Sequence, residues 1–595
     1  MLIDQIIQGK VVEAINELYG QVINVNLVQI ENTRKDVEGD LTVVVFPFLR
    51  FSKKSPEQTA NVLGEYLCSN VDTVESYSVI KGFLNLVISK SYWLGVLEEA
   101  SNDGSFGFVP ARDDSDLVMV EYSSPNTNKP LHLGHIRNNL LGYSVSKLLK
   151  ASGKNVLKVN LVNDRGIHIC KSMLAWKLFG NGETPESSGK KGDKLVGDYY
   201  VLFDKKYKAE IAELMASGLS EEQAAQSSVF MQQAREMLVK WEARDEETIR
   251  LWEMMNGWVY KGFDITYKRL GVDFDKIYYE SQTYLLGKKT VQEGLEKGIL
   301  FRKDDGSVWI DLSDDGLDEK LLLRADGTSV YMTQDLGTAQ LRADDFNPQS
   351  LVYVVGNEQN YHFDVLKLIL KKLGRPWADS IFHLSYGMVE LPEGKMKSRE
   401  GTVVDADDLI DEMVATARAM TEELGKIEDF NSKEAEALYR MVGLGALKYY
   451  MLKVDPKKNM LFNLRESIDF NGNTGPFIQY TYARIKSVLR KAAIAEAANE
   501  PFTGVTLQSK EAALLILLYQ FPQTVIQAAE EYSPSVIANY LFELAREYNQ
   551  FYHELTILKE PDAASRALRL SLSKLTAQVI QTGLDLLGIE VPEKM

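Results

Sequence analysis

The stretch Leu117-Val-Met-Val-Glu-Tyr-Ser-Ser-Pro-Asn-Thr-Asn-Lys-Pro-Leu-His-Leu-Gly-His135 decides how this chain of 595 residues folds. It opens with an apolar, β-favouring run, Leu117 to Tyr122, of the kind that forms a strand buried on both faces. Downstream, apolar residues recur at helical spacing from Ile136 until Gly153. The pattern therefore predicts a strand, a loop and a crossing helix, which is half of a nucleotide-binding unit.

Two histidines three residues apart stand where this helix should begin. Helix N-termini offer unpaired N–H groups and a positive dipole end, which favour a bound phosphate. His132 and His135 would add directed donors, Lys129 would add a cation, and Gly134 would let a flat ring such as adenine approach the backbone. A lone histidine here is more often a packed helix-start residue, but the spaced pair around a glycine favours a nucleotide site.

Length and composition are typical of a multidomain globular protein. With 595 residues and 45% hydrophobic content, the chain is long enough for three or four domains. The longest strongly apolar run, Ala512 to Tyr519, falls short of the ~20 residues that cross a bilayer, so we expect no membrane span. The N-terminus lacks the basic and apolar segments of a signal peptide, which predicts a cytoplasmic protein.

Cysteine content and charge narrow the class further. The two cysteines, Cys68 and Cys170, can build neither a disulfide framework nor a cysteine-based zinc site, so we expect no protein-bound zinc. The formal net charge of −17 argues against general affinity for nucleic acid, which depends on lysine and arginine. Any RNA partner would need locally basic surfaces.

Strand and helix patterns alternate along the first two thirds of the chain. This alternation predicts an α/β fold with a doubly wound, Rossmann-type domain and a smaller α/β domain before it. A Gly-, Ser- and Lys-rich stretch, Gly180 to Asp198, is expected to be flexible and to open a set of helical insertions. The predicted boundaries are 1–112 for the small domain, 113–405 for the Rossmann-type domain with insertions over about 180–280, 406–472 for a helical connector and 473–595 for an all-α helical bundle.

The segment Pro125 to His135, PNTNKPLHLGH, resembles the HIGH signature of class I aminoacyl-tRNA synthetases and is most similar to its form in arginyl-tRNA synthetases. HxGH is shared with adenylyltransferases that activate small acids, so a second signature is needed. The resemblance implies catalytic roles for Lys129, His132 and His135. The resemblance implies that Pro125, Asn128, His132, Gly134 and His135 bind ATP.

The second signature is Lys395-Met-Lys-Ser-Arg-Glu-Gly401. Alone, such a run is more often a solvated surface loop, but it resembles the KMSKS loop in its KMSTRxG variant. The resemblance implies a catalytic Lys395, with Lys129 compensating for Ser398, which stands where the general motif has lysine. Lys397 departs from the family's serine and leaves open which cation contacts pyrophosphate. The ATP-binding residues expected around this loop are Met388, Lys395, Lys397, Ser398 and Arg399.

A third cluster matches the family's amino-acid site. The segment Asp326 to Asp335, DGTSVYMTQD, fits the pattern DGTxxYxTxD. A carboxylate such as Asp335 can accept bidentate hydrogen bonds from a guanidinium, while Tyr331 supports it and excludes water. The alternative is a helix-start aspartate and a tyrosine at the edge of a core. The residues implied for arginine are Glu121, Asn126, Tyr331, Asp335 and Gln359.

One loop departs from the family pattern. The family's Asp-Trp-Gly with a following glutamine is here Asp164-Arg-Gly-Ile-His168. Polar loops at the carboxyl ends of strands are where open parallel sheets bind ligands. We therefore carry Asp164 over to the arginine site, and His168 either replaces the missing polar side chain or is structural.

Both ends of the chain resemble tRNA-binding parts of the family. Residues 473–595 are similar to its helical anticodon-binding domain of the DALR type, and residues 1–112 to its additional N-terminal domain. Aromatic side chains can stack on splayed bases, although tyrosines on helices are more often core residues. The tRNA-binding residues expected are Tyr480, Arg484, Tyr548, Tyr552 and Asn85.

The resemblance spans nearly the whole chain and implies arginyl-tRNA synthetase activity. L-Arginine would be activated by ATP with Mg²⁺ to arginyl-adenylate and passed to the terminal adenosine of tRNA(Arg), with release of AMP and pyrophosphate. The resemblance also implies a monomer and a need for tRNA before activation. Two alternatives stay open: another HxGH enzyme, such as a different class I synthetase, and a non-catalytic tRNA-binding paralogue, which the intact His132, His135 and Lys395 disfavour.

Overall fold

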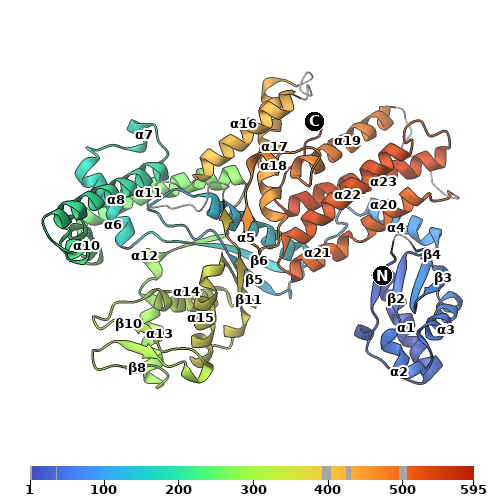
Figure 1. Ribbon diagram of the computed structural model, residues 1–595, viewed down its shortest axis with the longest axis horizontal. Coiled ribbons are helices and arrows are strands. Elements are labelled where there is room, and N and C mark those ends of the chain that lie inside the picture. The colour runs from blue at the N-terminus through green and yellow to red at the C-terminus, as the bar shows by residue number, and fades with distance from the viewer. Residues whose placement is uncertain (1–2, 35–36, 391–403, 424–429, 495–504) are drawn as a thin grey trace. The chain divides into compact units, whose positions relative to one another are not determined.

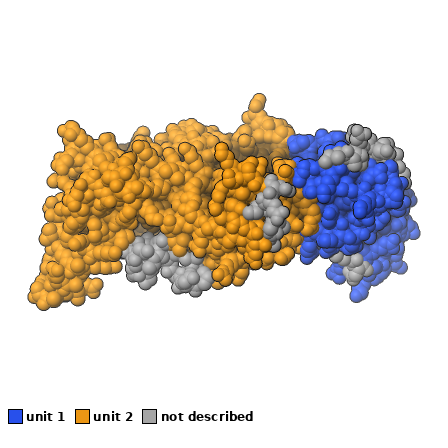
Figure 2. Space-filling model, turned by 90° about the horizontal axis from the view of Figure 1, so that it is seen from above, with its two compact units in different colours: residues 1–106, 485–522, 544–579 blue, residues 107–484, 523–543, 580–595 orange. Residues whose placement is uncertain are grey.

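A computed structural model describes residues 3–34, 37–390, 404–423, 430–494 and 505–595. The chain divides into two compact units, which Figure 2 shows in different colours. The C-terminal helices contribute to both units, a division that the sequence pattern does not indicate. Unit 1 comprises residues 1–106, 485–522 and 544–579, and unit 2 comprises residues 107–484, 523–543 and 580–595.

Unit 1 contains a four-stranded antiparallel sheet in the order β1-β2-β4-β3, with α3 packed on β3 and β4. Ser55 and Gln58 exchange hydrogen bonds in a capping box at the start of α3, and Pro56 fills its first turn. These residues therefore form the α/β structure expected for them. The elements are α1 (Ile3–Tyr19), β1 (Ile30–Asn32), β2 (Leu41–Val44), α2 (Leu49–Ser52), α3 (Pro56–Asn70), β3 (Val74–Ile80), β4 (Phe83–Ile88) and α4 (Lys90–Asn102).

Unit 2 is built on a five-stranded parallel sheet in the order β12-β11-β5-β6-β7. Its central strands β11, β5 and β6 are labelled in Figure 1. Numbered along the chain and read from the β7 edge, this order is 3-2-1-4-5, so the sheet is doubly wound, and a doubly wound fold is what the sequence predicts. The winding reverses between β5 and β11, and ligands of such sheets bind beyond the carboxyl ends of strands at that point. The strands are β5 (Leu117–Glu121), β6 (Asn155–Val162), β7 (Lys276–Tyr279), β11 (Ser350–Gly356) and β12 (Ile381–Tyr386).

Helices cover both faces of this sheet. On one face α5 packs closely, because a Cβ on its Gly142 would lie only 2.3 Å from Cβ of Tyr122. On the other face Met119 belongs to a core shared with Leu336 of α14 and Ile369 of α15. The elements are α5 (Leu133–Ala151), α13 (Leu286–Glu296), β8 (Phe301–Arg302), β9 (Val308–Ile310), β10 (Lys320–Leu323), α14 (Tyr331–Phe346) and α15 (Asn360–Lys372).

A helical insertion separates β6 from β7. The stretch Gly180 to Asp198, expected to be flexible, instead contains α7 and the start of α8. Its Gly192 serves close packing, because a Cβ there would lie 2.3 Å from the carbonyl oxygen of Trp258 in α11. The elements are α6 (Ile167–Phe179), α7 (Pro185–Ser188), α8 (Gly192–Ala216), α9 (Glu221–Ser227), α10 (Val229–Glu242), α11 (Glu246–Leu270) and α12 (Glu280–Thr283).

The described residues beyond β12 are mainly helical, as predicted. By length and composition Ser509–Glu530 could cross a membrane, since an 18-residue window of it has a mean hydropathy of 1.4. The segment consists of two helices, however, and 44% of that window is buried inside the protein. The elements are β13 (Val389–Glu390), α16 (Ala406–Glu423), α17 (Ser432–Leu452), β14 (Met460–Leu461), α18 (Leu464–Ser467), α19 (Gly475–Ile494), α20 (Ser509–Tyr519), α21 (Phe521–Glu530), α22 (Pro534–Glu554) and α23 (Ala563–Leu586).

Candidate active site

The two histidines of HLGH begin α5 at the carboxyl edge of the sheet. His132 is the N-cap residue, and its Nδ1 accepts a hydrogen bond from the Gly134 N–H at 3.2 Å. Nδ1 of His135 accepts from the His132 N–H, also at 3.2 Å. Because each Nδ1 is an acceptor, each neutral ring carries its proton on Nε2. The backbone therefore selects the tautomer in which Nε2–H is the donor of both rings.

Burial keeps this pair uncharged. Burial, and then the charge of Lys129, lowers the pKa of His132 to about 3. Burial, together with His132 and Lys129, lowers the pKa of His135 well below its ordinary value. The ring centroids lie 4.0 Å apart, so two imidazolium charges would repel strongly. Both histidines are neutral at physiological pH and can still donate one hydrogen bond each.

The chain turns sharply between β5 and the histidines. Ser123 and Ser124 have φ angles of 79° and 44°, in the left-handed region. Such strain persists where the surroundings fix the backbone, and here the side chains of Asn138 and Asn160 accept from the two serine N–H groups. Beyond the turn, Pro125 and Asn128 are buried, Lys129 is half-buried and Asn126 is exposed.

Glu121, the last residue of β5, is bound to an internal cation. It is 7% exposed and forms an ion pair with Arg342 of α14, which is 1% exposed. The Arg342 guanidinium also lies 5.2 and 5.3 Å from the ring centroids of Tyr278 and Tyr353. Burial opposes its charge, but the Glu121 carboxylate raises the pKa of Arg342 above its ordinary value. One Glu121 oxygen is held by Arg342, and the other accepts from the Ser124 hydroxyl at 3.2 Å.

The helix α14 carries the other residues predicted for a guanidinium. Tyr331, Asp335 and Arg342 follow one another at spacings of four and seven, which places them on one face of α14. Oδ2 of Asp335 lies 2.6 Å from Nε2 of His362 in α15. Tyr331 is 77% exposed, and Gln359 is also exposed. Tyr353 interacts electrostatically with both Glu121 and Asp335, so the two carboxylates belong to one region.

Glu280 is a further carboxylate that the sequence analysis missed. It follows β7 directly, and its side chain hydrogen-bonds Gln334 and interacts electrostatically with Asp335. Burial raises the pKa of Glu280 to about 7; Arg165 lowers it, whereas Asp164 and Asp335 raise it. The signal that could have found Glu280 is its place after a strand, but the edge strand β7 was itself not predicted.

The structure corrects the assignment of Asp164 to an arginine site. Its side chain is 1% exposed and accepts from the N–H and hydroxyl of Ser281 at 2.8 and 2.7 Å and from the Tyr260 hydroxyl at 2.8 Å. Nδ1 of His168 lies 2.9 Å from the Tyr200 hydroxyl. Asp164 is therefore a structural link between the β6 loop, α11 and α12, and the His168 contact favours its structural reading.

Comparison with known proteins identifies the family. The family model "tRNA synthetases class I (R), catalytic domain" matches residues 102–464, and the model "DALR anticodon binding domain" matches residues 478–595. The chain belongs to the arginyl-tRNA synthetase family.

Similar proteins of this arginyl-tRNA synthetase family match over their full lengths. The arginine–tRNA ligase of Bacteroides thetaiotaomicron is 60% identical over 598 residues, covering 100% of both chains. That of Porphyromonas gingivalis is 57% identical over 597 residues, again with 100% of both chains covered. The solved Thermus thermophilus arginyl-tRNA synthetase is 26% identical, with a TM-score of 0.80 over 99% of this chain and 100% of that chain.

The second signature of this family, Lys395 to Gly401, lies outside the described residues. Lys395, Lys397, Ser398 and Arg399 all lie in the segment 391–403, which the structure does not describe. Met388, just before it, is 47% exposed, and its N–H donates to Oδ1 of Asn459 at 2.8 Å. Of the expected ATP-binding residues near this loop, the structure therefore places Met388.

Two residues expected to bind tRNA are interior. Tyr548 has 0% exposure, and its hydroxyl donates to Oγ of Ser573 at 3.1 Å, so its ring cannot stack on a base. Asn85 is 4% exposed, and its amide is hydrogen-bonded within the N-terminal sheet. Both assignments are corrected. The other three candidates, Tyr480, Arg484 and Tyr552, keep exposed surface, and the Arg484 guanidinium lies 4.9 Å from the Tyr480 ring centroid.

Proposed function

We propose that this chain catalyses the ATP-dependent ligation of L-arginine to tRNA(Arg). One observation carries the proposal: a neutral histidine pair at a helix start and a group of carboxylates lie at the carboxyl edge of one doubly wound sheet. The histidine pair suits a triphosphate, and the carboxylates suit a guanidinium. Full-length similarity to arginine–tRNA ligases supports the same reading.

In the activation step, an oxygen of the arginine carboxylate bonds to the α-phosphorus of ATP while the bond to the bridging oxygen of pyrophosphate breaks. The reaction needs no side-chain nucleophile, because alignment and stabilisation of the phosphate charge suffice. The Nε2–H groups of His132 and His135 supply donors that the backbone has already oriented, and Lys129 supplies positive charge. Lys395, with Lys397 and Arg399, would neutralise the departing pyrophosphate.

Specificity would come from the acidic side of the site. Asp335 and Glu280 would bind the guanidinium beneath Tyr331. A neutral amino acid would bring no cation to these carboxylates, so discrimination needs no editing site. The residues proposed around the substrate's amino group and remaining polar atoms are Glu121, Asn126 and Gln359.

The remaining substrates follow from the same reaction. The nucleotide is ATP with Mg²⁺, and arginine passes from the adenylate to the terminal adenosine of tRNA(Arg), with release of AMP. The C-terminal helices, with Tyr480, Arg484 and Tyr552, would contact the anticodon arm. In agreement with the family resemblance we propose a cytoplasmic monomer, which sedimentation of the purified chain would test.

Pyrophosphate exchange with each of the twenty amino acids, with and without tRNA, tests the proposal. We expect exchange with arginine and none with the others, and we expect the arginine signal only when tRNA(Arg) is present. A signal with a different amino acid would make the chain another class I synthetase. No exchange under any condition, with tRNA binding retained, would indicate a non-catalytic paralogue.

A further inference from the structure

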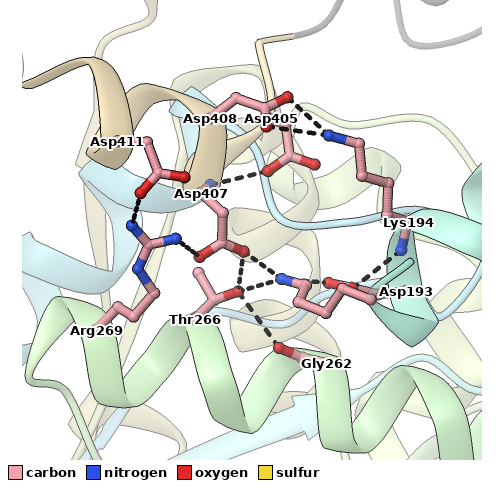
Figure 3. A network of polar contacts seen from close by, with 10 residues as sticks. Asp193, Lys194, Gly262, Thr266, Arg269, Asp405, Asp407, Asp408 and Asp411 are labelled. Carbon is pink, nitrogen blue, oxygen red and sulfur yellow. Dashed lines mark hydrogen bonds and ion pairs between the residues drawn. The ribbon is translucent and has the colours of Figure 1, made fainter. Parts of the chain in front are cut away.

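A polar network joins the helical insertion to the start of α16 (Figure 3). Asp407, in the first turn of α16, accepts hydrogen bonds from Lys191 at the start of α8 and, each at 2.8 Å, from Thr266 and Arg269 of α11. The Asp407 and Lys191 side chains are 14% and 18% exposed. Donors from two regions of the insertion thus hold one nearly buried carboxylate.

The Lys191 ammonium is held from a second side as well. It lies 3.1 Å from Oδ2 of Asp193, whose side chain is 0% exposed. Asp193 fits because Gly262 of α11 has no side chain: a Cβ there would lie 2.4 Å from Oδ1 of Asp193. Burial opposes ionisation of Asp407, but Lys191, Thr266 and Arg269 lower its pKa below the ordinary value. The network is therefore an ordered cluster rather than a set of exposed surface pairs.

The residues just before the clamped carboxylate pair with the histidine signature. The Leu133 N–H donates to the Val404 carbonyl at 3.2 Å, and the Ala406 N–H donates to the Leu131 carbonyl at 2.9 Å. These two bonds lie on either side of His132. His132 itself forms an antiparallel bridge with Asp405. The backbone position of His132 is thus set by a segment that ends at the network.

The same insertion helix also touches the loop before the signature. A Cβ on Gly197 of α8 would lie 2.8 Å from Cδ of Pro130 and 3.5 Å from Cα of Lys129. The close approach means that α8 and this loop cannot shift independently. The helix α8 therefore contacts the loop before the signature through Gly197, and Lys191 at its start connects it to the signature through Asp407.

We propose that Asp407 is a positioning residue for amino-acid activation: it fixes residues 404–406, and through them the place of His132 over the nucleotide. The inference rests on the proposed function, because it takes His132 to act on ATP. A displacement of about 1 Å at a reacting group can lower a rate about 100-fold, so a contact remote from the nucleotide can control turnover.

Neighbouring aspartates of α16 provide matched controls for Asp407→Asn. Asp408 pairs with Lys194 and Asp411 pairs with Arg269, but their side chains are 63% and 69% exposed. Asp408→Asn and Asp411→Asn remove the same charge from the same helix and should keep kcat of arginine-dependent pyrophosphate exchange within about twofold. Asp407→Asn should lower kcat by about 10- to 100-fold while the KM for arginine stays nearly constant.

Variants of Lys191 separate positioning from general stability. Lys191→Met should reproduce the loss of kcat, whereas Lys191→Arg, which keeps a cation, should restore most of it. Asp407→Asn should be assayed well below its Tm. A normal kcat there, or a loss of kcat no larger than that of Asp411→Asn, would overturn the proposal, and a lower Tm alone would not rescue it. If Asp407→Asn does not fold, the two Lys191 variants provide the test. Equal kcat in Lys191→Met and Lys191→Arg would overturn the proposal. Absence of arginine-dependent exchange in the wild-type chain would instead count against the proposed function.

Discussion

Arginine binding should weaken steeply as the pH falls below 7, because Glu280 must ionise to receive a guanidinium. The pKa of Glu280 is raised to about 7, mainly by burial. The charge of Arg165 lowers this pKa, whereas the charges of Asp164 and Asp335 raise it. A cation bound beside this carboxyl favours the charged form. Arginine binding therefore lowers the pKa of Glu280 and releases protons near neutral pH, and acid opposes binding.

The magnitude follows from the ionised fraction of Glu280. With a pKa of about 7, about nine tenths of the molecules carry the carboxylate at pH 8 and about one tenth at pH 6. If arginine binds the ionised form, its Kd should rise about tenfold between pH 8 and pH 6. That change corresponds to about 1.4 kcal/mol of binding free energy.

Titration calorimetry of arginine into the enzyme without ATP measures this directly. Repeating each titration in buffers with different ionisation enthalpies gives the number of protons released. Glu280→Gln should bind arginine more weakly at pH 8 and lose most of the pH dependence. Glu319→Gln, which removes a half-exposed partner of Lys303, should keep the wild-type profile. A wild-type Kd that is constant from pH 6 to 8, or an unchanged pH dependence in Glu280→Gln, would show that Glu280 does not receive the guanidinium.

Three further substitutions test the pocket and its supports. Asp335→Asn should raise the KM for arginine about 10- to 100-fold in pyrophosphate exchange, because hydrogen bonds to charged groups contribute about 1.5–3 kcal/mol. The KM for ATP should stay near normal. Unchanged arginine affinity would show that Asp335 does not belong to the pocket. Glu121→Gln leaves Arg342 buried without its partner and should lower the free energy of unfolding in urea by about 3–5 kcal/mol, with partial recovery when Arg342→Met is added. Equal losses in the single and double variants would contradict that account. Gly142→Ala places a Cβ against Tyr122 and should destabilise the chain by about 1–3 kcal/mol in thermal unfolding, and an unchanged Tm would show that α5 can move away.

Local patterns sufficed for the elements around the signature. The strand predicted over Leu117 to Tyr122 ends one residue earlier, and the helix predicted after it ends at Ala151, shortly before Gly153. The strand is an apolar run followed by a polar loop, so burial on both faces of a parallel sheet leaves a clear signal. The family motifs then directed attention to His132 and Asp335, because their neighbours in sequence are also their neighbours in the site.

Residues whose role depends on distant partners could not be found in this way. Arg342 matters because it meets Glu121, and no local pattern announces a pairing between a strand end and a much later helix. Tyr548 has the same helical context as Tyr552, yet one is buried and the other 38% exposed. The stretch around Gly192 resembles a flexible linker by composition, whereas the missing Cβ of Gly192 lets α8 pack closely on α11.

The central position of β5 has a consequence for synthesis of the chain. One edge of β5 pairs with β6, but the other waits for β11, which begins roughly 230 residues after β5 ends. At ~5–20 residues per second, the ribosome leaves that edge without its partner for about 10–45 s. An apolar strand with an open edge is a template for pairing with other chains. We therefore expect the yield of folded protein to depend on the speed of translation between β6 and β11 as well as on the sequence.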